Sequence, residues 1–220
     1  MQFNIFRGLA IALLIGVVVA CWLGGGDGNA LDVALIRDGI AARGAGPLPT
    51  EAGLFLNYAG GAPATLGLGL AATLLLYFRG HPRAAAWLIG IAGIGRLLIE
   101  GVKLAVHRAR PALDPHPVLT HSLSFPSAHA ANSMIVFPAL VLFLVAPGKR
   151  AVPMTIAILA SLLVGASRPL LGVHWPSDVI AGWAIGGAWL VLAWPIARAS
   201  VSRQLHHDVV GGHRSALLER

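Results

Sequence analysis

Two polar stretches interrupt an otherwise apolar chain and hold its densest grouping of basic and imidazole side chains before the C-terminal tail. The first covers residues 103–129 and reads KLAVHRARP, then, after a polar loop, FPSAH. The second covers residues 168–178 and reads RPLLGVHWPSD. Ionisable side chains beside membrane-like segments are costly to place, so we expect them to serve a function.

The basic residues of the first stretch have a helical spacing. Lys103, His107 and Arg110 follow the i, i+4, i+7 pattern that places side chains on one helical face. If the preceding helix continues this far, they converge at its end and favour an anion. Arg suits a phosphate through paired hydrogen bonds, and Lys adds a point charge. The alternative is that long side chains simply reach from a helix end to the membrane interface.

Ser127 and His129 stand at the start of the next apolar run. The free N–H groups in the first turn of a helix form a ready anion site, and Ser127 would face it. A histidine one step further in can donate a proton to a leaving oxygen. The alternative is a helix cap followed by a packed histidine.

In the second stretch, Asp178 follows His174 by four residues and begins another apolar run. A carboxylate at this spacing can accept a hydrogen bond from one imidazole nitrogen. That bond fixes the tautomer and leaves the other nitrogen nucleophilic. A buried structural His–Asp contact is the alternative.

Taken together, the motifs are more specific than their parts. In order along the chain they read Lys, six residues, Arg-Pro; then Pro-Ser-x-His; then Ser-Arg, five residues, His, three residues, Asp. This series resembles the three-part signature of the type-2 phosphatidic acid phosphatase family. That family shares its core with bacterial acid phosphatases and vanadium haloperoxidases. The resemblance implies that His174 attacks phosphorus to form a phosphohistidine, Asp178 orients it, and His129 protonates the leaving group and then activates water.

The resemblance also implies a set of phosphate-binding residues: Lys103, Arg110, Ser127, Ala128 (through its backbone N–H) and Arg168. Ala128 is a departure, because the family usually has Gly at this position. We expect its methyl group to leave less room between the backbone and a phosphate, while Ser127 and His129 stay intact.

Composition indicates the elements that must position these residues. Of the 220 residues, 56% are hydrophobic and 11% charged, against about 25% charged in soluble domains. Charge-free windows of about 17–20 residues are typical of transmembrane helices. We predict an all-α polytopic membrane protein, a bundle of six transmembrane helices with the active site at its outer (periplasmic) end. The expected spans are residues 8–23, 62–78, 84–102, 128–146, 153–166 and 179–197.

The expected organisation is one membrane phosphatase domain over residues 1–200 and a basic, histidine-containing cytoplasmic tail over 201–220. An outer loop, residues 24–61, would carry interfacial helix, since residues 31–43 have mixed helical amphipathicity. The first span also resembles a signal peptide, so a cleaved leader is the alternative. Gly182 and Gly186 form a small-xxx-small pair that favours close helix packing.

Basic residues predict the orientation. With six spans, Arg7, the 79–83 turn, the 149–150 turn and the tail fall on one side, which the positive-inside rule places in the cytoplasm. Both termini would then be cytoplasmic. Both polar stretches would face outward from a bacterial-type inner membrane.

The formal charge of +7 comes without a long basic run, which argues against a nucleic-acid partner. We expect instead a lipid phosphate within the bilayer, with undecaprenyl diphosphate slightly favoured by analogy over phosphatidic acid or phosphatidylglycerol phosphate. No carboxylate cluster suits magnesium, so we expect no metal and no cofactor. The single cysteine, Cys21, forms no internal disulfide.

Other classes of function remain as alternatives. One is a metal-dependent hydrolase that uses four histidines, His107, His116, His121 and His129, although their spacing matches no standard ligand pattern. Another is a transporter, which predicts polar groups at mid-membrane and discontinuous helices. The third is haloperoxidase-like vanadate chemistry on the same scaffold.

Overall fold

The computed structural model describes residues 28–120 and 122–218, together with a few separate positions between 8 and 19. Beyond residue 201 it describes the backbone only. The predicted first span, with its likeness to a signal peptide, and Cys21 therefore lie largely outside the described residues. His121 and the side chains of the predicted tail also lie outside them.

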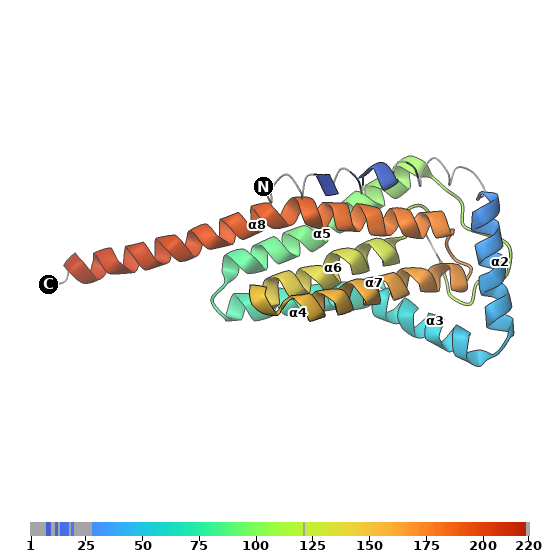
Figure 1. Cartoon of the computed structure of the whole chain (residues 1–220), viewed down its shortest axis with the longest axis horizontal. Helices are drawn as coiled ribbons and strands as arrows, with labels where there is room; N and C mark the ends of the chain where they lie inside the picture. The colour runs from blue at the N-terminus through green and yellow to red at the C-terminus, as the bar shows by residue number, and fades with distance from the viewer. Residues whose placement is uncertain are drawn as a thin grey trace.

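Helices make up the regular structure of the described part. Two lie at one end, α2 (Ala30–Gly44) and α3 (Pro47–Gly60), and a 3₁₀ turn, η1 (Pro147–Lys149), joins α6 to α7. The helices that run along the bundle are α4 (Ala62–Phe78), α5 (Pro82–Val106), α6 (Ala128–Leu144), α7 (Ala151–Leu170) and α8 (Pro176–Leu218) (Figure 1). The predicted all-α fold is confirmed for this part of the chain.

Three of these helices are long and apolar enough to cross a membrane: α5, α7 and the part of α8 up to Val201. The pair α3 and α4, bent by 42° where they join, would make a fourth span, and α6 is a shorter apolar helix of 17 residues. The predicted membrane character is therefore confirmed. The count of six spans and the outward orientation stay predictions.

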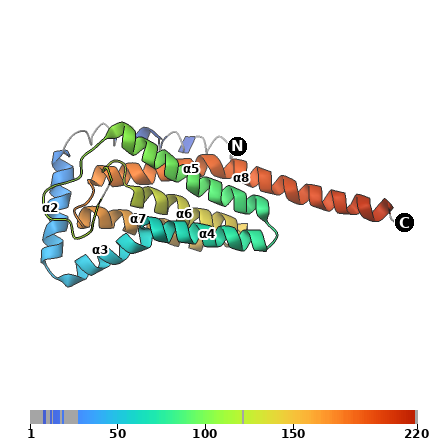
Figure 2. The ribbon, with the colours of Figure 1, turned by 180° about the vertical axis from the view of Figure 1, so that it is seen from behind.

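The predicted amphipathic segment forms as α2, which stands across one end of the bundle (Figures 1 and 2). The side chain of Asn29 caps it by accepting a hydrogen bond from the N–H of Asp32 at 2.9 Å. Gly39 packs on the end of α7, because a Cβ there would lie 3.0 Å from the Leu170 Cα and the Pro169 carbonyl oxygen. Thus α2 covers the end of the bundle where α7 finishes and α8 begins.

The predicted close contact of the sixth span is confirmed between α8 and α6. A Cβ at Gly182 would lie 2.6 Å from the Ser127 carbonyl oxygen, and one at Gly186 would lie 2.6 Å from that of Ala131. Only glycine allows backbones to approach this closely. This contact holds the first turns of α6 and α8 side by side, and with them His129 and Asp178.

The apolar core lies toward the opposite end. Leu76, Leu88 and Ile91 of α4 and α5 pack with Ile135 of α6 and Leu190 of α8. Each is at most 7% exposed. The bundle therefore has an apolar half and, under α2, a half in which buried polar residues gather.

Candidate active site

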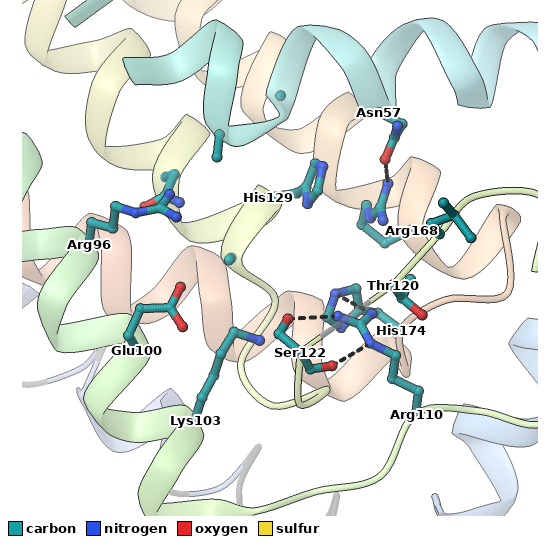
Figure 3. Close-up of a pocket in the computed structure, with 15 residues that line it drawn as sticks. Asn57, Arg96, Glu100, Lys103, Arg110, Thr120, Ser122, His129, Arg168 and His174 are labelled. Atoms are coloured by element: carbon teal, nitrogen blue, oxygen red, sulfur yellow. Dashed lines mark hydrogen bonds between the residues drawn. The ribbon is translucent and has the colours of Figure 1, made fainter. Parts of the chain in front are cut away.

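A cavity of about 260 Å³ opens in the polar half of the bundle. Figure 3 shows side chains converging on it from α3, α5, α6 and α7, and from the loops between α5 and α6 and between α7 and α8. The predicted site residues among those that line it are Lys103, Arg110, Ala128, His129, Arg168 and His174. The other two, Ser127 and Asp178, are fully buried just behind the wall.

The geometry around His174 assigns its tautomer. Arg110 NH1 lies 3.0 Å from His174 Nε2. A guanidinium has no acceptor, so Nε2 accepts this bond and the ring proton lies on Nδ1. On that side Nδ1 donates to Asp178 Oδ2 at 3.3 Å. The imidazole is therefore neutral, and the lone pair of Nε2 points to Arg110, which lines the cavity.

The electrostatic surroundings keep that imidazole neutral. Burial lowers the pKa of His174 well below its ordinary value of 6.5, and the charges of Arg110, Arg168 and Lys103 lower it further. Burial also lowers the pKa of Arg110, an effect that Asp178 opposes. A guanidinium stays charged despite such a shift. His174, the candidate nucleophile, therefore lies beside a permanent positive charge on Arg110.

Asp178 accepts hydrogen bonds from several donors besides His174, and the sequence spacing did not indicate them. Its Oδ2 also accepts from the Ser124 hydroxyl and, at 2.9 Å, from the Trp175 backbone N–H. Its Oδ1 accepts from Arg108 NH1 at 2.7 Å. The carboxylate is 0% exposed, so these bonds fix its position beside His174.

The prediction that one helical face carries Lys103, His107 and Arg110 is wrong. Helix α5 ends at Val106, and His107 adopts a left-handed conformation with φ +52° that terminates it. The helical region is also disfavoured for Arg110, because Pro111 follows it. The chain therefore turns, leaving His107 exposed, and Arg110 reaches the cavity from an extended loop.

Backbone carbonyl groups orient the side chains of the other two residues of the predicted helical face, Lys103 and Arg110. Lys103 Nζ donates to the Leu123 carbonyl oxygen at 2.6 Å, and Arg110 Nε donates to that of Ser122 at 2.8 Å. Both acceptors lie in the loop that leads back to α6. Although no single helix carries them, the two cations meet at one cavity.

Two buried donors at the site have no hydrogen-bond partner among the described residues: Ser127 Oγ and Arg168 Nε. Arg168 is 2% exposed, and its NH1 donates to Asn57 Oδ1 of α3 at 2.5 Å. Buried polar atoms are nearly always satisfied, so a pair of unsatisfied donors beside one cavity points to an acceptor that binds there. The tetrahedral oxygens of a phosphoryl group would supply it.

His129 projects into the cavity from the first turn of α6 (Figure 3). A Cβ added at Gly61, where α3 bends into α4, would lie 3.7 Å from its Nε2. His129 and His174 therefore reach the cavity from different helix ends. Ala128 lies in the wall itself, so its methyl group stands where the family usually has none.

Several residues that sequence reasoning did not assign to the site belong to it. Asn57, Arg108 and Ser124 contact predicted site residues directly. Arg96 and Glu100, four residues apart on α5, also line the cavity.

Of the four histidines proposed for a metal-dependent hydrolase, the three that the structure describes do not lie together. His107 is exposed, and His116 Nε2 is bonded to the Pro111 carbonyl oxygen at 2.8 Å. Neither lines the cavity with His129. His121, the fourth, lies outside the described residues.

Comparison with curated proteins finds relatives that are lipid phosphatases by name. The chain is 38% identical over 104 residues to phosphatidylglycerophosphatase B of Bacillus subtilis, covering 44% of this chain and 49% of that protein. It is 33% identical over 125 residues to undecaprenyl-diphosphatase of Sulfolobus acidocaldarius, covering 53% and 56%. The chain thus spans about half the length of the curated relatives it matches.

A solved structure is similar over most of the fold. The crystal structure of a transmembrane PAP2-type phosphatidylglycerolphosphate phosphatase from Bacillus subtilis matches with a TM-score of 0.78 and 26% identity, covering 86% of this chain and 96% of that one. The family model for the PAP2 superfamily matches residues 84–202, a segment that contains all eight predicted site residues. The chain therefore belongs to the PAP2 superfamily.

Proposed function

We propose that the protein is an integral-membrane phosphatase that hydrolyses a lipid phosphate through a phosphohistidine on His174. The observation that carries this proposal is the bond from Arg110 to His174 Nε2, because it requires a neutral imidazole whose lone pair points to one of the cations that line the cavity. Neutral imidazole is the nucleophilic form.

In the first step, the Nε2 lone pair of His174 forms a bond to phosphorus. The bond from phosphorus to the leaving oxygen breaks, and that oxygen takes the electron pair together with a proton from His129. In the second step His129 accepts a proton from water, the water oxygen attacks phosphorus, and the P–N electrons return to Nε2. Throughout, Asp178 accepts a hydrogen bond from Nδ1–H and stabilises the imidazolium-like intermediate.

The phosphoryl oxygens would be bound by Lys103, Arg110 and Arg168, with Ser127 and the N–H of Ala128 at the start of α6. Phosphoryl transfer depends mainly on positioning and charge neutralisation, and fixed cations supply both. We therefore propose that the reaction is independent of metal. As substrate binds, the hydrogen bond that Arg110 NH1 donates would move from His174 Nε2 to a phosphoryl oxygen. This change frees the Nε2 lone pair that attacks phosphorus.

The proposed substrate is a lipid phosphate or diphosphate that enters from the bilayer. Undecaprenyl diphosphate is the first candidate, and phosphatidylglycerol phosphate or phosphatidic acid is the alternative within the same chemistry. The membrane helices and the names of the relatives support a lipid substrate. The proposed location is a bacterial-type inner membrane with the site facing outward.

The test is phosphate release by the purified protein from a panel of lipid monophosphates and diphosphates, with a strong chelator present. We expect turnover to continue in the chelator and to be inhibited by vanadate, a mimic of the five-coordinate phosphoryl group. We expect His174→Ala to abolish turnover while the protein still inserts into the membrane. Loss of activity in chelator that is restored by one added metal would instead support a metal-dependent hydrolase.

A further inference from the structure

Arg108 bridges two buried carboxylates that come from distant parts of the chain. Its NH1 donates to Asp178 Oδ1 at 2.7 Å, and its NH2 donates to Asp32 Oδ2 at 2.9 Å. Asp178 is the partner of His174, whereas Asp32 lies on α2, outside the segment that the family model matches. The three side chains are at most 3% exposed.

Asp32 is also bonded to the start of α8. Its Oδ1 accepts from the Ser177 backbone N–H at 2.9 Å, and its Oδ2 accepts from the Ser177 hydroxyl at 2.6 Å. The same hydroxyl accepts from Arg108 NH1 at 2.8 Å. A carboxylate at the N-terminus of α8 is favourable, so Asp32 joins α2 to the turn that carries Asp178.

Packing leaves this group little freedom. The Arg108 guanidinium lies 5.4 Å from the centre of the Trp175 ring. A Cβ at Gly28, the residue just before the cap of α2, would lie only 2.5 Å from Cζ3 of that indole. Buried charges are stable only with close partners, and here one guanidinium is shared between two carboxylates.

We propose that Asp32 and Arg108 are positioning residues for His174. Arg108 fixes Asp178 where it accepts the hydrogen bond from His174 Nδ1. Asp32 partly neutralises the charge of the Arg108 guanidinium, so that Asp178 keeps its attraction for the Nδ1 proton. This inference rests on the proposed phosphohistidine chemistry. It makes α2, a helix outside the family motifs, part of the support of the nucleophile.

The charges predict opposite effects for the two neutralising variants. The ionisable groups that face His174 are contributed by five different segments: Lys103, Arg110, His129, Arg168 and Asp178. Arg108→Gln removes a positive charge behind Asp178, which favours protonated His174, so the acid limb of kcat/KM moves to higher pH. Asp32→Asn removes a negative charge, so that limb moves to lower pH or stays where it is.

The experiment measures kcat, KM and the pH profile of the full-length purified enzyme with the lipid phosphate that it turns over fastest. For Asp32→Asn and Arg108→Gln we expect kcat to fall about 10- to 100-fold, as for other residues that orient a reacting group. The KM is expected to stay within about twofold, because Lys103 and Arg168 still bind the phosphoryl group.

Asp114→Asn is the matched control. Arg43 NH2 bonds Asp114 Oδ2 at 2.8 Å, so this pair also anchors α2 but touches neither Asp178 nor His174. We expect this variant to keep kcat within about twofold of the parent enzyme. An equal loss of kcat in Asp114→Asn would show that α2 acts only as a structural cover and would overturn the inference.

Two further outcomes would overturn it: parental kcat in both neutralising variants, or acid limbs that shift in the same direction. If Arg108→Gln does not accumulate as folded protein, Arg108→Lys retains the charge and should keep the acid limb in place while lowering kcat. His174→Ala separates the two proposals. Turnover by that variant defeats the phosphohistidine mechanism, whereas an inactive His174→Ala beside fully active Asp32→Asn and Arg108→Gln defeats only this inference.

Discussion

At the scale of single residues, the site depends on a histidine that stays neutral among cations. His174 is surrounded by Arg110, Arg168 and Lys103, and each of these charges disfavours a second ring proton. Asp178 lies on the opposite side of the ring and holds the first proton on Nδ1. The cations that would bind phosphate therefore also keep His174, the proposed nucleophile, in its neutral form.

Arg110→Gln tests this double role. The variant loses a cation and two donors at the phosphate, so we expect kcat/KM to fall by about 10²–10³. Because one of the charges that depress the pKa of His174 is removed, the pKa rises, and the acid limb of the pH profile moves toward neutral pH. Arg79→Gln, which changes an exposed arginine at the other end of the bundle, should leave both quantities unchanged. An unmoved limb in Arg110→Gln would contradict the assigned electrostatics.

Sequence motifs predicted which residues meet at the cavity but not all of their supports. Lys103, Arg110, His129, Arg168 and His174 were recognisable because a short signature fixes their types and spacing. The contact of Asp32 with Arg108 spans 76 residues, and no local pattern in an amphipathic helix indicates which carboxylate is buried.

At the scale of elements, glycines at two places in the fold determine how the helices that carry the proposed catalytic groups fit together. Gly182 places the start of α8 against Ser127, and the bend between α3 and α4 follows the pair Gly60 and Gly61. That bend brings Asn57 within reach of Arg168. The positions of helices α4 to α8 could be predicted from apolar runs. The helical spacing extended to Arg110 was wrong, because α5 ends at Val106 and His107 is left-handed.

Gly182→Ala tests the contact between α6 and α8. The added methyl group would meet the Ser127 carbonyl oxygen, so the helices must separate, at a cost of about 1–3 kcal/mol. We expect a lower melting temperature in detergent and a loss of kcat, since His129 and Asp178 move apart. Gly90→Ala is the control, because a Cβ at Gly90 meets nothing within 4 Å. Equal stability of both variants would contradict the packing described.

Helix α5 also carries charged side chains along the cavity beyond Lys103. Glu100 and Arg96 lie about 4.5 and 10.5 Å from Lys103 along the helix axis, and both line the cavity. If the leaving group lies along this face, Arg96→Gln should lower kcat/KM for a lipid diphosphate more than for a lipid monophosphate, because the second phosphate loses a cation. An equal effect on both substrates, measured in the same lipid panel, would place the leaving group elsewhere.

At the scale of the whole molecule, the distribution of basic turns predicts which end of the bundle faces the cytoplasm. Single cysteines in a Cys21→Ala background test it with a membrane-impermeant thiol reagent. Leu113→Cys, in the exposed loop at the site, should react from outside intact cells. Lys149→Cys, in the turn between α6 and α7, should react only after permeabilisation. The reverse pattern would turn the site toward the cytoplasm.

The central claim is a covalent phosphoryl group on His174, and the most direct measurement is to trap it. The purified protein is mixed with a lipid phosphate ester whose leaving group needs no protonation, quenched, and mapped by mass spectrometry. In His129→Ala, where water is no longer activated, we predict that phosphohistidine accumulates at His174 and that His174→Ala abolishes it. Continued phosphate release without phosphoryl on any residue, or with phosphoryl on a residue other than His174, would contradict the mechanism.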